Sequence, residues 1–423
     1  MLTYEQALKR ILDATASPRM AVVRLHESLG LVLARPMRAR CDLPQFDNSA
    51  VDGYAMRAQD APQATLRVVG KAEAGRPFGT RVRPGEAVRI LTGAQVPHGA
   101  DAVVMQEHAI RRRRQLVIQR WPTPGQNIRR RGEDLRQGTR VLKTGTLLRP
   151  QDIGLLAALG VTRVPIYPRP TVAILTTGDE LASPGTRLKP GQIHESNGPL
   201  LHALVQQAGA RVVDLGTARD TIASLIHKVR RGLACDLLVI AGGVSVGDKD
   251  FVRNVAQRCG VRQLLWRVSI KPGMPLFVGT ARRTDVQRAT HRRRLVFGLP
   301  GNPVSVFVTF EEFVKPALYR LMGRGWRDPY IEPAVLIENL KIPHTRRTHF
   351  IRVRCSQHSQ LVAEPLDGQG SHRLRSLVEA DGWIRMNAER GPWSAGARVL
   401  VRPACAAPTE LPAFSATDKP EAA

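Results

Sequence analysis

The stretch that most constrains the fold is residues 237–251, in which a run of large apolar residues stops at a polar, glycine-containing loop. Four such residues in succession predict a strand covered on both faces of a sheet. Gly242 and Gly243 follow, and they allow backbone angles and a close approach to a ligand that a side chain would forbid. Asp248 and Asp250 end the loop, where an open parallel sheet binds its ligands. A tight turn whose acids only begin the next helix is the alternative interpretation.

The same pattern occurs twice more, in residues 171–181 and 295–305. Each begins with an apolar run and continues into a polar loop that contains glycine. In the second, Asn302 is placed as a helix N-cap and Pro303 as the first helical residue, so free backbone N–H groups are expected to point into the crevice and hold an anion. Three such strands would line one sheet edge with hydroxyls, carboxylates and helix N-termini. The sequence therefore predicts a site for a phosphate-bearing ligand and a divalent cation.

The chain is expected to be a multidomain α/β plus β protein, because 423 residues exceed what one hydrophobic core usually organises. Alternating strand and helix patterns predict a central three-layer α/β/α domain with a mostly parallel sheet. The predicted parts are a linking domain at 1–46 and 135–170, an inserted β-rich domain at 47–134, the α/β domain at 171–322, a small C-terminal barrel or sandwich at 323–404 and a disordered tail at 405–423.

Several local patterns give further expectations. Thr3 and Gln6 form a capping-box pair that predicts a helix over 3–14. Residues 25–34 suggest a second helix, and the turn formers and polar groups of residues 42–56 predict an exposed loop. Within the central domain, a strand is expected at 268–275 and a basic hairpin extension, most simply a solvated loop, at 282–294.

The formal net charge of +27, from 63 Lys plus Arg against 36 Asp plus Glu, raises the question of nucleic-acid binding. The arginine runs at 111–114, 129–131 and 292–294 are spread along the chain, and only 5% of residues are aromatic. No motif that presents base-stacking side chains occurs. We therefore expect nonspecific attraction of polyanions and no specific nucleic-acid partner.

The hydropathy, the first residues and the cysteine content favour a cytoplasmic protein. No apolar run approaches the roughly 18 residues needed to span a bilayer, and the start lacks the pattern of a secretory signal. No membrane association is expected. The five cysteines are an odd number, widely scattered and without a Cys-x-x-Cys pair, which argues against a disulfide framework or a zinc site.

Short motifs in three of the expected domains occur in one order along the chain. They are DNSAVDGYA at 47–55, RILTGA at 89–94, GED at 132–134, TTGDEL at 176–181, GGVSVGD at 242–248, KPG at 271–273, LPGNP at 299–303 and GSH at 370–372. In this combination the chain resembles the MoeA family of molybdopterin molybdenumtransferases, to which the E domain of gephyrin belongs. The resemblance extends from residue 3 to about residue 403.

The resemblance implies an elongated homodimer of four-part subunits. Such an enzyme takes adenylylated molybdopterin and molybdate, breaks the pyrophosphate link with the help of Mg²⁺, and releases molybdenum cofactor and AMP. A molybdopterin adenylyltransferase is a candidate partner. These expectations agree with the residue pattern, because carboxylates bind Mg²⁺ while glycine-rich backbone, helix N-termini and Lys271 can hold phosphates.

The family's site acids and hydroxyls correspond here to Asp52, Thr92, Asp134, Glu180, Asp220 and Asp250. Of these, the candidate catalytic residues are Asp52, Thr92, Asp134, Glu180 and Asp250, and the candidate metal ligands are Glu180 and Asp250. The candidate substrate-binding residues are Gly242, Gly243, Ser245, Asp220, Lys271, Pro300 and Pro303. Asp52 is the candidate for assisting metal insertion.

Two other classes of function remain open on the sequence. A lone domain like residues 171–322 also occurs in molybdopterin adenylyltransferases, although the segment that carries Asp52 and the C-terminal β domain argue against that assignment. A non-catalytic scaffold is the second alternative, since gephyrin also clusters receptors. The presence of all six polar site residues disfavours pure scaffolding.

Overall fold

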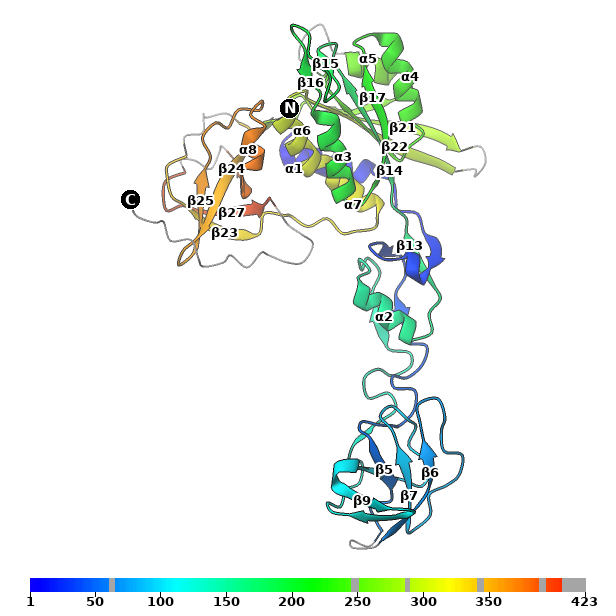
Figure 1. Ribbon diagram of the computed structural model, residues 1–423. Coiled ribbons are helices and arrows are strands. Elements are labelled where there is room, and N and C mark those ends of the chain that lie inside the picture. The colour runs from blue at the N-terminus through cyan, green and yellow to red at the C-terminus, as the bar shows by residue number, and fades with distance from the viewer. Residues whose placement is uncertain (61–64, 245–250, 286–289, 341–345, 388–392, 405–423) are drawn as a thin grey trace. The chain divides into compact units, whose positions relative to one another are not determined.

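The computed structural model describes residues 1–60, 65–244, 251–285, 290–340, 346–387 and 393–404, with only the backbone of 283–285 and 290–292. The predicted tail at 405–423 lies outside these ranges. The chain divides into two compact units (Figure 1). The large unit contains Met1–Ala21, Gly30–Val32 and Tyr167–Ala423, and the small unit contains Val22–Leu29 and Leu33–Ile166. In the described ranges, no helix is both long and apolar enough to cross a membrane.

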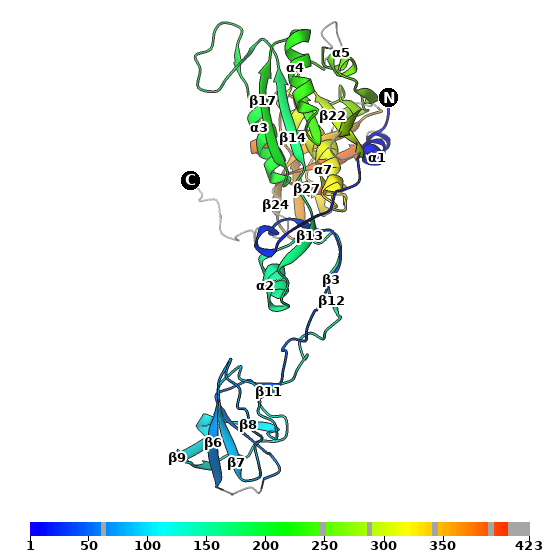
Figure 2. The same cartoon turned by 90° about the vertical axis from the view of Figure 1, so that its right-hand side faces the viewer.

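The small unit is built around a six-stranded sheet with the order β8-β5-β7-β6-β10-β9 (Figure 2). Its strands are β5 (Gly53–Met56), β6 (Leu66–Ala72), β7 (Glu86–Ile90), β8 (Ala102–Met105), β9 (Ala109–Arg112) and β10 (Gln115–Ile118). Apolar side chains from both faces of the sheet form two small cores. This confirms that a small β-rich domain is inserted here, as expected from the sequence.

The prediction of an exposed loop at 42–56 was wrong in its second half. Asn48 and Ser49 form the buried strand β4 (Asn48–Ser49), which pairs with β11 (Ile128–Arg129). All four residues of β5 are buried between β7 and β8. Because β5 is hydrogen-bonded to a strand on each side, this segment joins the sheet despite its many turn-forming residues. Within residues 48–56, Asp52 is the exposed residue.

Short two- and three-stranded sheets and one helix complete this part of the chain. They are β1 (Ala21–Arg24), β2 (Val32–Leu33) and β13 (Arg163–Tyr167) in one sheet, β3 (Met37–Arg38) and β12 (Arg140–Leu142) in another, and α2 (Pro150–Ala158). The helix expected at 25–34 was wrong, because only the 3-10 turn η1 (Leu25–Glu27) forms before β2. A second 3-10 turn, η2 (Gln106–His108), follows β8.

The large unit contains the predicted three-layer α/β/α arrangement. Its sheet has the order β17-β14-β18-β22-β21-β19, and the first four strands are parallel. The strands are β14 (Thr171–Thr177), β17 (Arg211–Ala218), β18 (Leu237–Ala241), β19 (Arg262–Trp266), β21 (Phe277–Asp285) and β22 (Thr290–Leu299). The three strands that carry the repeated sequence pattern, β14, β18 and β22, are neighbours, so their loops lie at one edge as expected.

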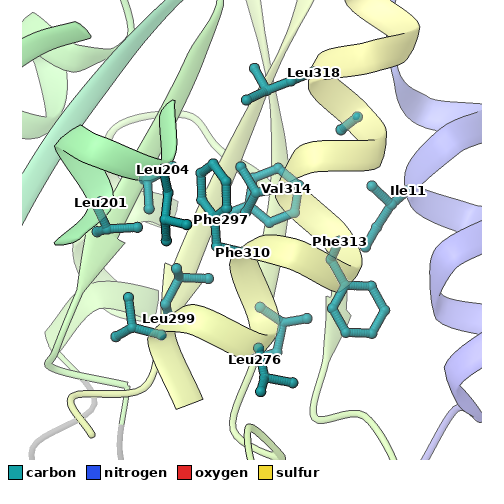
Figure 3. Close-up of a cluster of buried hydrophobic side chains, with 14 of the residues drawn as sticks. Ile11, Leu201, Leu204, Leu276, Phe297, Leu299, Phe310, Phe313, Val314 and Leu318 are labelled. Carbon is teal, nitrogen blue, oxygen red and sulfur yellow. The ribbon is translucent and has the colours of Figure 1, made fainter. Parts of the chain in front are cut away.

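Strand alternation divides the side chains of this sheet between two cores. Val172, Val239 and Phe297 face the core formed with α1 (Tyr4–Ala14), α3 (Asn197–Gln207), α6 (Pro303–Thr309), the π-helical turn η3 (Phe310–Val314) and α7 (Lys315–Leu321) (Figure 3). Ala173 and Leu238 face the core formed with α4 (Ile222–Gly232) and α5 (Phe251–Arg258). Every residue of β18 is buried, as a strand covered on both faces requires.

The hairpin expected at 282–294 is present as β21 paired with β22 in antiparallel register. Its base is not a solvated loop. Arg294 is only 7% exposed, and its Nη1 lies 2.6 Å from Oδ1 of Asp236. The other carboxylate oxygen of Asp236 accepts hydrogen bonds from Thr171 at the start of β14. This arginine therefore belongs to the buried frame of the sheet.

The C-terminal part of the large unit is a closed five-stranded barrel. Its strands follow the order β24-β25-β23-β27-β26, and β26 pairs back to β24. They are β23 (Glu332–Leu336), β24 (Thr348–Gln357), β25 (Leu361–Pro365), β26 (Gly382–Asn387) and β27 (Arg398–Pro403), with the short helix α8 (Arg375–Val378) between β25 and β26. The strand expected at 268–275 shrinks to β20 (Ile270–Lys271), which pairs with β24 and so extends the barrel's sheet instead of the central one.

A buried polar cluster joins this barrel to the helices of the large unit. Glu312 in η3 is fully buried and accepts hydrogen bonds from Tyr4 Oη at 2.8 Å, Tyr330 Oη at 2.9 Å and Arg402 Nη1 at 2.7 Å. Arg402 also pairs with Glu311. Because these groups come from α1, η3, the segment before β23 and β27, the cluster holds four parts of the fold together. The predicted capping box of Thr3 and Gln6 begins α1 and is confirmed.

Candidate functional site

Asp52 and Thr92 form a hydrogen-bonded pair on the small unit. Oδ1 of Asp52 accepts from both the backbone N and Oγ1 of Thr92, each at 2.7 Å. Asp52 lies just before β5 and Thr92 just after β7, and these two strands are paired, so sheet register brings the residues together. Gly93 follows with φ +79°, a left-handed conformation that favours glycine and lets the chain turn there. Both side chains are exposed, so the carboxylate can also reach a ligand.

The surroundings of Asp52 favour its ionised form. The two hydrogen bonds from Thr92, assisted by the positive charge of Arg89, lower the pKa of the Asp52 carboxyl below its usual value. Arg89 is itself held in place, because its Nη1 donates to the carbonyl of Gly53 at 3.0 Å and its guanidinium lies over the ring of Tyr54. The pair is therefore a fixed, negatively charged acceptor.

The third candidate of the small unit, Asp134, is exposed, and its backbone N donates to Leu43 O at 3.1 Å. The neighbouring acids have structural partners. Asp47 accepts from Arg130 Nη1 and from the backbone N of Arg131, both at 2.8 Å. This acid therefore fixes the arginine run at 129–131 against the start of β4.

In the large unit, Asp220 lies at the sheet edge. Its Oδ1 accepts from Thr177 Oγ1 at 2.5 Å, and its backbone N donates to Oδ1 of Asp179 at 3.2 Å. Thr177 ends β14, and Asp220 follows the neighbouring parallel strand β17. Asp220 also stands just before Thr221, the N-cap of α4. The edge position thus comes from parallel pairing and the hydroxyl contact.

Glu180 is exposed in the turn after β14. Its backbone carbonyl accepts from Ile193 N at 2.9 Å, where β15 (Leu181–Ala182) pairs with β16 (Ile193–His194). Gly178 precedes it, and a Cβ there would stand only 2.8 Å from the Glu180 carboxylate oxygens. A bare glycine therefore allows this carboxylate to fold back toward the edge that carries Thr177 and Asp220.

Gly242 and Gly243 are required by close packing at the end of β18. A Cβ on Gly242 would stand 2.4 Å from the carbonyl oxygen of Thr177, and one on Gly243 would stand 2.9 Å from Val252 Cγ2. Both residues have positive φ, at +95° and +65°. The glycine pair therefore brings backbone directly beside Thr177. The predicted close approach of these glycines to a ligand stays a prediction.

The loop after β22 contains Pro300, which is buried, and Pro303, which is half-buried at the first turn of α6. Asn302 is the N-cap, as predicted, but its Nδ2 donates to Ser371 Oγ at 3.0 Å. The backbone N of Val304 donates to Ser371 O at 3.1 Å. The expectation of free N–H groups at this helix start was therefore wrong for Val304, because a barrel segment already accepts its hydrogen bond.

Lys271 is exposed at the end of β20, opposite His349 of β24. Burial of His349, with the nearby charges of Lys271 and Arg347, lowers the pKa of its imidazole. Ser245 and Asp250 lie outside the described residues. Lys271 is therefore placed on the barrel's sheet, whereas Asp220, Glu180 and the two glycines share the edge of the central sheet.

Carboxylate oxygens at this edge suit Mg²⁺ by chemistry, since the ion prefers oxygen ligands and is commonly held by one or two carboxylates, waters and substrate phosphates. Glu180 offers such a carboxylate. Within the ranges that the structure describes, no group of three or more His, Cys, Asp or Glu side chains is arranged to hold a metal ion by itself.

Sequence reasoning missed a polar cavity of about 560 Å³ beside β14, β17 and α3. Thr176 and Thr217 line it, and their hydroxyls lie 2.9 Å apart. Glu195, only 8% exposed, also lines it and accepts from the backbone N of Gly198 at 2.8 Å. The two threonines at the end of the apolar run could have indicated this cavity, because neighbouring side chains of a strand lie on opposite faces. Thr176 lines the cavity, and Thr177 contacts Asp220.

Three family models together match most of the chain. They are the MoeA N-terminal region (domain I and II) at residues 2–160, the "Probable molybdopterin binding domain" at 173–320 and the MoeA C-terminal region (domain IV) at 337–404. The first covers the unit with Asp52 and Thr92, and the second covers the sheet edge with Glu180 and Asp220.

Individual proteins give the same result. The chain is 36% identical over 413 residues to the molybdopterin molybdenumtransferase of Haemophilus influenzae, covering 95% of this chain and 98% of that one. It is 37% identical over 415 residues to molybdopterin molybdenumtransferase 2 of Mycobacterium tuberculosis, with coverage of 95% and 99%. The crystal structure of the molybdopterin biosynthesis MoeA protein from Pyrococcus horikoshii matches with a TM-score of 0.80 and 30% identity, over 96% of this chain and 99% of that one. On this combination of motifs, fold and full-length similarity, the chain belongs to the MoeA family.

Proposed function

We propose that this chain is a molybdopterin molybdenumtransferase that inserts molybdate into adenylylated molybdopterin, with Mg²⁺-dependent release of AMP, as the final step of molybdenum cofactor biosynthesis. The observation that carries the proposal is the Asp52–Thr92 pair, because Thr92 fixes an exposed carboxylate with two hydrogen bonds and leaves it open to a ligand. The full-length relatives named as molybdopterin molybdenumtransferases support the same assignment.

Asp52 is proposed to act on the oxyanion. As the pterin's two thiol groups form bonds to molybdenum, one molybdate oxygen takes up the two thiol protons and leaves as water. The ionised carboxylate held by Thr92 can accept a hydrogen bond from a thiol and help pass its proton to the departing oxygen. Asp134 is proposed to serve the same step.

The sheet edge is proposed to bind the phosphate-bearing substrate. The backbone at Gly242 and Gly243 lies close to Thr177. In the sequence, Ser245 follows β18, and Pro300 and Pro303 follow β22. Asp220 and the cation of Lys271 complete the proposed substrate-binding set. Glu180 and Asp250 would hold Mg²⁺, which when bound neutralises negative charge on phosphate oxygens.

The direct test is to incubate the purified chain with adenylylated molybdopterin, Mg²⁺ and either molybdate or tungstate. We expect AMP and active cofactor to appear together with the physiological oxyanion, and neither product without Mg²⁺. Release of AMP in the absence of any oxyanion, with no cofactor formed, would refute metal insertion and leave only a phosphohydrolase.

A homodimer is proposed as the working assembly, in the cytoplasm, with a molybdopterin adenylyltransferase as the enzyme that supplies substrate. Asp52 and Glu180 are carried by different units of the chain, so a dimer that pairs them between subunits predicts complementation. Mixed Asp52→Asn and Glu180→Gln chains should recover roughly a quarter of the activity, because half the dimers are mixed and half of their sites are intact. Differently tagged chains prove mixing, and no recovery in proven heterodimers would mean that each subunit builds its site alone.

A further inference from the structure

A large basic cavity lies on the small unit, apart from the Asp52–Thr92 pair. It has a volume of about 960 Å³ and is formed by β6, β7, the segment 78–83 and the β9–β10 hairpin. These strands belong to one sheet, in which β6 lies between β7 and β10. Seven cationic side chains line the cavity and only one acid does, namely Arg67, Lys71, Arg81, Arg83, Arg89, Arg111 and Arg114 with Glu86.

The positive charge in this cavity is only partly neutralised. Arg67 pairs with Glu86 at 2.7 Å, and Lys71 pairs with Glu73. The other five lining cations have no carboxylate within ion-pair distance in the part of the chain that the structure describes. Six of the seven cations are exposed, so water and salt screen much of their mutual repulsion. An anion with several charges that contacts several of these cations would lower the remaining repulsion further.

The shape of the cavity favours a small ligand that carries several linked phosphates. Arginine guanidinium groups match phosphate oxygens with paired hydrogen bonds. Arg81, Arg83, Arg111 and Arg114, which form no ion pair among the described residues, suit more than one phosphate. A hollow of about 960 Å³ lies at the upper end of the size range of small-molecule sites, well above the need of a single tetrahedral anion.

One wall of the cavity is apolar. Phe78 lines it, and the ring lies against the backbone of Gly70, where a Cβ would stand 2.3 Å from Phe78 Cε2. Gly70 therefore allows an aromatic side chain to sit beside the arginines. Such a wall suits a planar ring attached to the phosphates, because aromatic faces stack on one another.

We propose that this cavity is a second anion site of the chain, which binds an oligophosphate-bearing small molecule such as a nucleoside polyphosphate. Arg89 links it to the Asp52–Thr92 pair, because Arg89 lines the cavity, contacts the carbonyl of Gly53 and lowers the pKa of Asp52 by its charge. The inference does not rest on the proposed function, because it concerns binding by the small unit alone.

The arginine run at 111–114 supplies a matched test. Arg111 and Arg114 line the cavity, whereas Arg112 and Arg113 do not. Alternation along β9 sends Arg111 and Arg112 to opposite faces, and Arg113 turns away with φ +52°. The double variants Arg111→Gln/Arg114→Gln and Arg112→Gln/Arg113→Gln thus remove the same charge from neighbouring positions, one pair inside the cavity and one outside.

Binding of ATP, inorganic tripolyphosphate, AMP and phosphate to the full chain is measured by calorimetry at fixed ionic strength. We expect a saturable site, additional to any binding at the sheet edge, that is tightest for the two triphosphates. The cavity double variant should raise the Kd of this site about tenfold or more and the outside variant about twofold or less, and neither should change binding at the sheet edge. Tighter binding of ATP than tripolyphosphate would assign the Phe78 wall to a nucleoside ring; equal binding would assign the site to the phosphate chain alone.

A second variant guards against unfolding of the hairpin, since Arg111 Nε also donates to Arg113 O at 2.8 Å. Arg83 lies in the loop before β7. The variant Arg83→Gln should therefore weaken ligand binding while leaving the thermal unfolding temperature unchanged. The proposal would be overturned if both double variants lost the same binding affinity or if binding did not saturate. It would also be overturned if both variants weakened the binding of a duplex DNA probe equally, because each of these results indicates general attraction of anions to the surface.

Discussion

Asp52 in the small unit and Glu312 in the large unit are carboxylates whose pKa values shift in opposite directions. Asp52 is exposed, and two hydrogen bonds from Thr92 lower its pKa. Glu312 is fully buried, and loss of solvation raises its pKa to about 7 despite hydrogen bonds from Tyr4 and Tyr330. The contrast separates two uses of a carboxylate: one is held charged and open to a ligand, and the other is enclosed as a joint between structural elements.

This difference cautions against locating a site from the size of a pKa shift. The larger shift belongs to Glu312, which is fully buried and has Tyr4, Tyr330 and Arg402 as its hydrogen-bond partners. Structural networks also perturb pKa values, so the shift must be read together with exposure and geometry. The exposure of Asp52 indicates that it can contact a ligand, whereas the burial of Glu312 indicates a stabilising role.

The largest effect is expected from Asp52→Asn. The amide keeps the shape but removes the charge, so cofactor formation should fall by about 10²- to 10⁴-fold while binding of the pterin nucleotide and the unfolding temperature change little. Single-turnover cofactor formation and equilibrium binding measure the two quantities separately. The exposed Asp13→Asn in α1 is the matched control and should be silent. Parallel losses of binding and turnover would contradict the assigned role.

Glu312→Ala should act on stability instead. Truncation leaves two tyrosine hydroxyls and one arginine donor without this acceptor in a buried place, which costs about 3 kcal/mol or more. Glu312→Gln retains an acceptor oxygen and should cost less. Chemical denaturation measures the loss, and activity per folded molecule should remain near that of the wild type. A variant that is fully stable but inactive would move Glu312 into the catalytic group.

Thr177→Val tests the sheet-edge counterpart of the Asp52–Thr92 pair. Without the hydroxyl, Asp220 loses its 2.5 Å hydrogen bond, and kcat/KM should fall about tenfold. Thr176→Val is the neighbouring control, because its hydroxyl contacts Thr217 on the other side of the strand. Steady-state kinetics measures kcat/KM for both variants. Equal decreases in the two variants would show that the loss comes from altered packing and not from the hydrogen bond to Asp220.

The smallest effect is a pH dependence of stability. Because the folded-state pKa of Glu312 is about 7 against a usual 4.5, its contribution is fully present below pH 4.5 and is lost as pH rises toward 7. Asp52 has the opposite sign: its contribution is present above its usual pKa of 3.8 and is lost as pH falls through the lower folded value. Unfolding midpoints between pH 4.5 and 7 should therefore decline less steeply in Glu312→Gln than in the wild type.

The sequence by itself determined the architecture of the large unit and most of its proposed sheet edge. The apolar run at 237–240 and its two repeats predicted three strands of one sheet with their polar loops at one edge, because each pattern can be recognised within a short stretch of sequence. The structure adds that β14, β18 and β22 are neighbours in that sheet. Gly242 and Gly243 were predictable for the same reason, since only glycine permits the close approach to Thr177 that the structure contains.

Tertiary structure alone decided which polar groups are partnered. The sequence could not show that Arg294 is buried against Asp236, that a barrel segment accepts the N–H of Val304, or that residues 53–56 form a buried strand. Each of these depends on a partner that is distant in sequence, and burial reverses the preference of a polar residue once that partner satisfies its hydrogen bonds. The pairing of Asp52 with Thr92 was fixed in the same way, by the register of β5 against β7.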